Sequence, residues 1–335
     1  MSRTLWPLLP LVPLYRAAQA LNDFAYARGW RHVESLVWPV VSVGNLSLGG
    51  AGKTPFVIAL ARALTERGWL VDVLSRGYGR ASDAVEPVSI KGGDDPARRY
   101  GDEPWLIAQR AGVPVFVGRR RADVGQLAEK ALVNAKDTRH VHLLDDGMQH
   151  RGLVRDTEIV LLHRSDFQTM LLPAGRLREP LAALGRADFV VLREEDADLA
   201  ERARRWMRAD AQLWTIRREL EVPVLPGPAV VFCAIARPEE FVKGLQAKGV
   251  ASTAMHTWRD HHRFSEGNLI MLSELAAQHG AACFLTTAKD AVRLTDAQRA
   301  RLSKVAPVLV ANLTVRLLDP QTALAALEEH LRRHA

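Results

Sequence analysis

A glycine-rich segment between a strand and a helix constrains the fold of this chain more than any other part of its sequence. Residues 41–64 read VSVGNLSLGGAGKTPFVIALARAL, so an apolar strand leads into a loop and then into a helix that begins at Lys53 or Thr54. Glycines let backbone N–H groups converge on phosphate oxygens, and a helix N-terminus adds unpaired donors and a positive dipole end. The segment predicts a phosphate-binding loop (P-loop) in an α/β protein.

The loop matches the P-loop consensus, Gly, four residues and Gly-Lys-Ser/Thr, except that Ser47 stands at the leading glycine position. Lys53 is expected to bridge the β- and γ-phosphates, and the Thr54 hydroxyl to bind Mg²⁺. An ordinary glycine turn would not explain the ordered set of strand, loop, Lys-Thr and helix. The residues predicted to contact the nucleotide are Gly44, Asn45, Ser47, Gly49, Gly50, Ala51, Gly52, Lys53, Thr54 and Pro55.

Two adjacent aspartates follow a second apolar strand and are candidates for the metal site. HVHLL (140–144) leads directly into Asp145 and Asp146. An acidic residue at a strand end is the usual second half of a P-loop NTPase site, where a carboxylate holds the metal directly or through water. Asp-Asp-Gly is also a good turn sequence, so a solvated turn is the alternative. The P-loop favours the metal role.

Short Val-rich strands alternate with helical segments along most of the chain, a pattern typical of a doubly wound parallel sheet. The strands expected before the Pro-rich segment 223–228 are 36–43, 69–75, 113–118, 140–144, 158–163 and 187–192. Those expected after it are 229–235, 250–256, 281–286 and 305–311. We therefore predict an N-terminal segment (1–35), a P-loop domain (36–222) and a smaller α/β domain (223–335), with the ligand between the two domains.

The N-terminal segment is apolar but too short to span a membrane. Residues 5–15 read LWPLLPLVPLY, which is interrupted by prolines, whereas a spanning helix needs about 20 apolar residues. Helical spacing then places Leu14, Ala18, Leu21 and Ala25 on one face. An interfacial membrane anchor and a helix packed on its own domain both fit this pattern.

The chain is basic, with a net charge of +7 and a pI near 9.7, which suits an anionic partner. It has no zinc knuckle and no RNP-like aromatic run, so nucleic acid is not expected as the partner. Nucleotides, phospholipid headgroups and phosphorylated sugars are all compatible with the charge.

Seven motifs that occur in order between residues 36 and 294 resemble those of the tetraacyldisaccharide 4′-kinases. They are GNLSLGGAGKTP, SRGYGR, GDEP, DDGMQH, LLPAGRLREP, DHHRF and TAKDAVRL. The resemblance implies transfer of the γ-phosphate of ATP, with Mg²⁺, to the 4′-hydroxyl of a tetraacylated glucosamine disaccharide 1-phosphate in lipid A biosynthesis. It also implies peripheral or monotopic attachment to the cytoplasmic face of the bacterial inner membrane.

The same resemblance implies roles for individual residues. Asp102 matches the catalytic base and His261 its histidine partner, while Lys53 and Arg178 would balance phosphate charge. The metal-site residues implied are Thr54, Asp145, Asp146 and Glu179, and the candidates for the substrate phosphate are Arg76, Arg121 and His150. Arg119 or Arg120 could serve in place of Arg121, and a solvated basic face is the alternative for this run. Ala234 and Ala236 stand where the family often has glycines, so a close backbone approach is less expected there.

A membrane-associated P-loop ATPase or GTPase that acts as a partner-regulated switch is the alternative function. Guanine-specific GTPases usually carry Asn/Thr-Lys-x-Asp, but here Lys289 and Asp290 are adjacent. Partitioning and metal-insertion ATPases usually have a second lysine early in the P-loop, and the positions before Gly52 contain none. Both observations favour the kinase.

Overall fold

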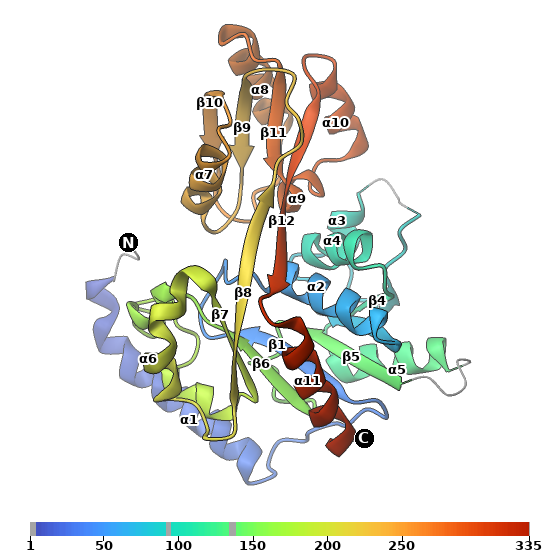
Figure 1. Ribbon diagram of the computed structural model, residues 1–335, viewed down its shortest axis with the longest axis vertical. Helices are drawn as coiled ribbons and strands as arrows, with labels where there is room; N and C mark the ends of the chain where they lie inside the picture. The colour runs from blue at the N-terminus through green and yellow to red at the C-terminus, as the bar shows by residue number, and fades with distance from the viewer. Residues whose placement is uncertain (1–4, 92–94, 134–138, 335) are drawn as a thin grey trace.

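The computed structural model describes residues 5–91, 95–133 and 139–334, and it shows two α/β lobes joined by one continuous sheet (Figure 1). The strand order is β10-β9-β11-β12-β8-β7-β6-β1-β5-β2-β4-β3. Strands β1–β8, together with the C-terminal helix, form the first lobe. Strands β9–β11 and the first half of β12 form the second, smaller lobe.

The first lobe is a doubly wound, mostly parallel sheet, because its strands are apolar on both faces. Its strands are β1 (Val40–Asn45), β2 (Trp69–Ser75), β3 (Glu86–Pro87), β4 (Val115–Val117), β5 (Arg139–Asp145), β6 (Thr157–Leu161), β7 (Phe189–Arg193) and β8 (Gln212–Glu221). Every residue of β1 is buried between β5 and β6. In the sheet, β5 and β2 lie on one side of β1 and β6 lies on the other side. The strand order therefore reverses at β1. In α/β sheets, ligands bind at the carboxyl ends of the strands where the order reverses.

Alternate side chains of the strands pack against helices on opposite faces of this sheet. Val41 and Val43 lie in the core under α2 (Lys53–Glu66), α4 (Asp102–Ala111) and α11 (Pro320–His334). Val40 faces the opposite core, against α5 (Arg121–Leu132). Shorter helices complete the lobe: α3 (Pro96–Tyr100), η2 (Arg164–Phe167), η3 (Leu181–Arg186), η4 (Glu194–Leu199) and α6 (Ala200–Arg204).

The second lobe has its own sheet and its own core. Its parallel strands are β9 (Ala229–Cys233), β10 (Ser252–Thr257), β11 (Cys283–Thr287) and the start of β12 (Val308–Leu317). One apolar cluster lies against α7 (Pro238–Ala247), and another lies against α8 (Glu266–Gln278) and α10 (Asp296–Ser303). The short α9 (Ala288–Ala291) follows β11 directly. The predicted α/β fold with a second, smaller α/β unit is confirmed.

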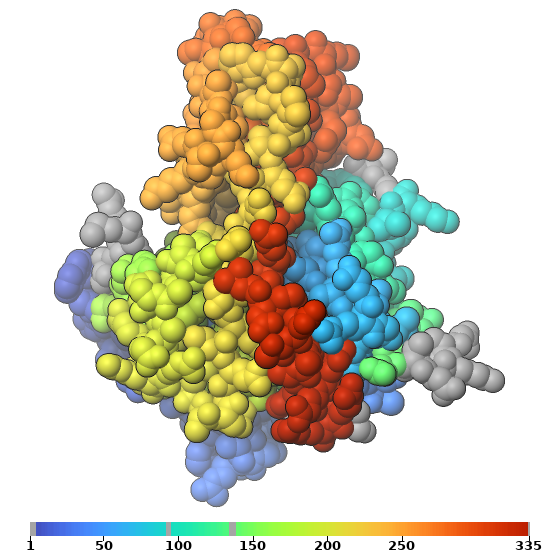
Figure 2. Space-filling model, in the orientation of Figure 1, coloured from blue at the N-terminus to red at the C-terminus, as the bar shows by residue number. Residues whose placement is uncertain are grey.

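A long antiparallel pair of strands connects the two lobes. The first half of β12 (308–311) pairs with β11, whereas its second half (312–317) pairs with β8. After β12 the chain enters α11, which Figure 2 shows on the surface of the first lobe beside α2. Leu327 and Leu331 of α11 are fully buried in the core of that lobe. The sequence reading did not foresee β8, and the end of β12 lies six residues beyond the expected strand.

This packing bears on the predicted domain division. We propose to keep the boundary near residue 222 but to assign residues 312–334 to the first lobe, because the apolar face of α11 is buried there and not in the second lobe. Residues 1–4, 92–94, 134–138 and 335 of the predicted domains lie outside the described residues.

The N-terminal helix lies against the first lobe with its polar side and turns apolar side chains outward. A 3₁₀ turn, η1 (Trp6–Leu11), leads into α1 (Val12–Ala27), which has no fully buried residue. The Tyr15 hydroxyl donates a hydrogen bond to the Arg178 carbonyl at 3.0 Å. Leu14 is 68% exposed and Leu21 is 66% exposed. In the described residues no helix is long and apolar enough to cross a membrane.

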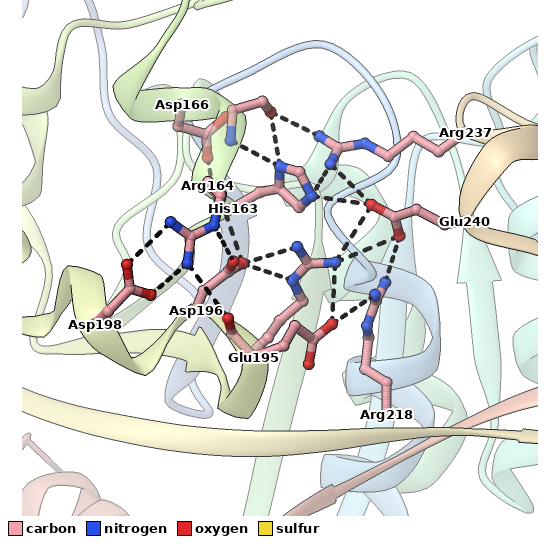
Figure 3. Close-up of polar contacts among 11 residues, drawn as sticks. His163, Arg164, Asp166, Glu195, Asp196, Asp198, Arg218, Arg237 and Glu240 are labelled. Carbon is pink, nitrogen blue, oxygen red and sulfur yellow. Dashed lines mark hydrogen bonds and ion pairs between the residues drawn. The ribbon is translucent and has the colours of Figure 1, made fainter. Parts of the chain in front are cut away.

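A network of ion pairs joins the lobes beside α7 (Figure 3). Glu240 on α7 accepts hydrogen bonds from Arg218 of β8 at 2.9 Å, from Arg237 at 3.2 Å and from Arg193 of β7 at 3.3 Å. Nε2 of His163, in the first lobe, lies 3.0 Å from the same carboxylate. One carboxylate therefore pairs with three guanidinium groups at the junction of the lobes.

Glu240→Gln is expected to lower the free energy of unfolding at pH 7 by about 1–3 kcal/mol, because it removes a charge that three arginines share. Burial alone would raise the pKa of Glu240, but the hydrogen bond with His163 and the arginine charges outweigh it and lower the pKa. The contribution is therefore complete above the unfolded carboxyl pKa, 4.5, and is lost gradually as the pH falls from there through the lower pKa of the folded state.

Urea unfolding at pH 7 and at pH 3 measures this effect. Glu239→Gln, at an exposed position on the same helix, is the matched control and should unfold like the wild type. A difference between Glu240→Gln and wild type that is as large at pH 3 as at pH 7 would contradict the ion-pair explanation.

Candidate active site

The P-loop is built between β1 and α2 as the sequence predicts, with α2 beginning at Lys53. Gly52, the residue before the helix, has φ 83°, a left-handed conformation that favours glycine. Gly50 also has a positive φ, and a Cβ there would lie 2.8 Å from Nε of Arg237 in the second lobe. A Cβ on Gly49 would lie 3.1 Å from that of Ala236, so the second lobe approaches the loop closely despite the alanine.

Lys53 lies across the loop, toward the end of β5. Its Nζ donates to Oδ1 of Asn45 at 2.7 Å and lies 3.3 Å from Oδ1 of Asp146. Arg178 converges on the same two acceptors, with Nη2 2.6 Å from Oδ1 of Asn45 and Nη1 2.9 Å from Oδ2 of Asp146. Two cations thus meet at the point where the carboxyl ends of β1 and β5 lie side by side. Such a pair can neutralise the charge of a transferring phosphoryl group.

The two aspartates after β5 have different environments. Asp146 has φ 53° and is paired with Lys53 and Arg178, whose charges lower its pKa against the opposing effect of burial. Asp145 is buried, and its pKa is raised to about 7 by burial together with the charges of Glu103 and Asp146. Its Oδ1 has no hydrogen-bond partner among the described residues. A buried carboxylate oxygen without a donor fits a bound divalent cation.

Asp102 and His261 come from different lobes and meet where the lobes contact each other. Asp102 is the first residue of α4, and Nδ1 of His261 lies 3.0 Å from its Oδ2. Among the non-glycine residues that the structure describes, only Asp146 and His261 have a positive φ, 53° and 62°. Backbone conformations of this kind concentrate at functional sites. Burial alone would raise the pKa of Asp102, but the His261 hydrogen bond and the Arg293 charge outweigh it and hold the pKa well below its usual range.

Glu179 is not brought together with the two aspartates. Its Oε1 accepts a hydrogen bond from Gln149 at 3.0 Å, and its Oε2 accepts one from Arg186 at 2.6 Å. Within the described ranges, no three His, Cys, Asp or Glu side chains are grouped closely enough to share a metal ion. The neighbouring Arg178, by contrast, reaches the P-loop directly.

Comparison with known proteins identifies the family. The family model for tetraacyldisaccharide-1-P 4′-kinase matches residues 4–332. A tetraacyldisaccharide 4′-kinase of Koribacter versatilis is 37% identical over 334 residues, which cover 97% of this chain and 98% of the relative. A second, from Anaeromyxobacter dehalogenans strain 2CP-C, is 40% identical over 314 residues, covering 87% and 82%. This chain belongs to the tetraacyldisaccharide 4′-kinase family.

A solved structure supports the same assignment at the level of the fold. The "apo" form of LpxK from Aquifex aeolicus, in complex with ATP, has a TM-score of 0.74 and 30% identity, and the match covers 97% of this chain and 98% of that one. The predictions of the family and of a phosphotransferase are confirmed. The comparisons favour the lipid A kinase over the ATPase or GTPase switch.

The residues predicted for the substrate phosphate, Arg76, Arg121 and His150, lie near one another after β2, at the start of α5 and after β5. Arg121 is buried, and burial lowers its pKa to about 10 against the opposing charge of Asp145. Burial, together with the charges of Arg121, Arg155 and Arg76, lowers the pKa of His150 to about 4. Two arginines beside a neutral histidine, which can still donate one N–H, are suited to an anionic ligand.

Sequence reasoning missed the cations that reach the cleft from the second lobe. Arg293 contacts Asp102, Lys289 pairs with Glu103 at 2.9 Å, and Arg237 lies over Gly50. The motif TAKDAVRL (287–294) contains Lys289 and Arg293, but the sequence gives no sign of the residues that they contact. Their partners lie almost 200 residues earlier in the chain, so spacing along the sequence could not have found them.

Proposed function

We propose that this protein transfers the γ-phosphoryl group of ATP to the 4′-hydroxyl of a tetraacylated glucosamine disaccharide 1-phosphate. The nearness of two groups of side chains is the observation that carries the proposal. Lys53 and Asp146 pair at the P-loop, where β1 and β5 end, and Asp102 pairs with His261 of the second lobe. Glu103, next to Asp102, is near enough to Asp145 for its charge to raise the pKa of that carboxyl.

In this proposal the residues of the P-loop side bind and neutralise the phosphates. Lys53 and Arg178 balance charge as it shifts from the terminal phosphate to the leaving oxygen. Thr54 and Asp145 would hold Mg²⁺, which supplies further neutralisation when it is bound. Asp146 would lie next to the ion. Glu179 is left out of the ligand set because Gln149 and Arg186 occupy its two oxygens.

The Asp102–His261 pair would handle the proton of the acceptor. Asp102 accepts the proton from the 4′-hydroxyl as the oxygen attacks the phosphorus atom. The Nδ1–H group of His261 donates a hydrogen bond to Oδ2 of Asp102 and so orients the carboxylate. Arg76, Arg121 and His150 would bind the 1-phosphate at the other end of the disaccharide, below α1.

A transfer assay tests the proposal. The protein is incubated with γ-labelled ATP, Mg²⁺ and the acylated disaccharide 1-phosphate in detergent micelles. We expect label in the lipid fraction, dependent on both the acceptor and the metal. Hydrolysis of ATP at the same rate with and without the acceptor, and no labelled lipid, would contradict a kinase and favour the switch ATPase.

We further propose that the outward face of α1 attaches the protein to the cytoplasmic face of the inner membrane, as a peripheral or monotopic protein. Exposed leucines on one helix face suit the boundary between headgroups and acyl chains, and the net charge of +7 suits anionic lipids. The partner is then a lipid surface, and nucleic acid is not expected to bind.

Leu14→Glu combined with Leu21→Glu is expected to lower binding to vesicles of anionic phospholipid by at least about 10-fold, because each buried leucine contributes about 1.5–3 kcal/mol. Vesicle sedimentation measures the bound fraction. Val224→Glu combined with Ile90→Glu, at residues that are 97% and 68% exposed, adds the same two charges elsewhere and should bind like the wild type. Equal loss in both proteins would indicate a general charge effect and contradict the anchor.

A further inference from the structure

We propose that Arg293 is a positioning residue for the phosphoryl transfer: it clamps one oxygen of Asp102 and leaves the other oxygen as the proton acceptor. This inference rests on the proposed function, in which Asp102 is the base. Arg293 is 8% exposed and lies just after α9, in the second lobe, whereas Asp102 is in the first lobe. The contact therefore crosses the cleft.

The two oxygens of Asp102 have different surroundings. Oδ2 receives Nε of Arg293 at 2.8 Å, Nη2 of Arg293 at 2.5 Å and Nδ1 of His261 at 3.0 Å. In the part of the chain that the structure describes, no donor bonds to Oδ1. Charge-assisted bonds of this kind are short and strong, so Oδ2 is fully engaged. Oδ1 is left as the oxygen that can receive a proton from the acceptor hydroxyl.

Arg293 is itself held from the other side. Its Nη1 donates to the Ala234 carbonyl at 2.7 Å and to Oδ1 of Asp290 at 2.9 Å. Asp290 is fully buried and accepts from the Ala234 N–H at 3.1 Å and from the Thr287 hydroxyl at 2.6 Å. Each donor-bearing edge of the guanidinium therefore has a fixed partner. A guanidinium locked in this way can hold the Asp102 carboxylate at one orientation.

Several charged groups face Asp102, most of them at longer range than His261 and Arg293. From the second lobe these are Lys289, Asp260 and Asp290, with His261 and Arg293, and from its own helix Glu103. Lys289 pairs with Glu103 and lies 3.4 Å from Nε2 of His261, on the side away from Asp102. Among these groups Arg293 is the cation in direct contact with the carboxylate.

The contact also links the position of the lobes to the state of the base. When the lobes are together, Arg293 and His261 both reach Asp102; if they separate, both contacts break because both side chains belong to the second lobe. Asp102 is then expected to lose its fixed orientation and its charged partner. The base would be competent only when the acceptor is enclosed, which limits transfer of the phosphoryl group to water.

Arg293→Met is expected to reduce kcat by at least about 10-fold at neutral pH and to leave the KM for ATP within about twofold. It should also move the acid limb of the kcat/KM profile upward by about one to three pH units, because an adjacent cation lowers a carboxyl pKa by that amount. Arg293→Lys retains the charge, so its acid limb should stay near the wild-type position while kcat falls. Arg301→Met, on exposed α10, is the matched control and should behave as wild type.

Arg293→Met leaves Asp290 buried without its cation, so the variant can fail to fold for that reason alone. The double variant Arg293→Met with Asp290→Asn removes both buried charges and keeps the shape of Asp290, and it should show the same shift of the acid limb. An acid limb at the wild-type position in folded Arg293→Met or in the double variant would overturn the proposal, as would a change confined to the KM for ATP.

The assay separates failure of this inference from failure of the proposed function. Asp102→Asn is measured beside the Arg293 variants with the same acceptor. If Asp102→Asn is inactive while Arg293→Met has the wild-type profile, only the role of Arg293 is lost. If Asp102→Asn is fully active, Asp102 is not the base, and both assignments are lost together.

Discussion

Replacing Asp102 with asparagine is expected to lower kcat for lipid phosphorylation by about 10²- to 10⁴-fold, the usual contribution of a general base. Asparagine has the shape of aspartate and still offers an oxygen to His261 and Arg293, but it cannot take the proton of the acceptor hydroxyl. Because Asp102 is not a P-loop residue, ATP binding should remain close to that of the wild type. Label transfer and fluorescent-nucleotide titration measure the two effects separately.

Asp296→Asn is the control for this experiment, because Asp296 is an exposed acid in the first turn of α10 and, among the described residues, is not paired with Asp102 or His261. Both variants should show the melting temperature of the wild type to within a few degrees. A kcat for Asp102→Asn within twofold of the wild type would show that another group accepts the proton.

Lys53→Met is expected to reduce kcat by at least about 10²-fold, the effect of removing one preorganised donor from a developing charge. Methionine keeps the unbranched stem and removes the ammonium that contacts Asn45 and Asp146. ATP affinity should fall as well, since the lysine contacts phosphates in the ground state and in the transition state. This combination distinguishes Lys53 from Asp102, whose loss should affect only the chemical step.

Nucleotide titration and single-turnover transfer of label measure the two consequences for Lys53→Met. Lys243→Met, at an exposed position on α7, tests whether loss of any lysine weakens the binding of an anion. Tight ATP binding in a Lys53→Met protein that also turns over normally would mean that the nucleotide lies elsewhere, and would contradict the P-loop assignment.

The parts of the site that could be predicted from the sequence are those formed within short stretches of chain. The P-loop lies between a strand and a helix that are contiguous in sequence, so glycine placement and Lys53-Thr54 were sufficient to locate it. Asp145 follows directly from a buried strand, and its position beside β1 follows from the parallel sheet. Motif order then pointed to Asp102 and His261, which the structure places 3.0 Å apart.

Contacts between distant segments could not be predicted in the same way. The family resemblance implied that Glu179 joins the metal site beside Arg178, but only Arg178 reaches Asp146, and Glu179 bonds to Gln149 and Arg186. The sequence after residue 223 looked like one domain because its strands and helices alternate. Hydrophobic spacing shows that α11 has an apolar face but does not say which core receives it.

Local sequence alone determined that this chain has a nucleotide-binding α/β fold, because backbone geometry and charge in a P-loop depend on a few adjacent residues. Only the tertiary structure decided how the base is assembled. Arg293 and His261 reach one oxygen of Asp102 from another lobe, across 191 and 159 residues of chain. Such a contact depends on the relative orientation of the two lobes, which the pairing of β8 with β12 determines. The hydrophobic periodicity of the sequence does not predict that orientation.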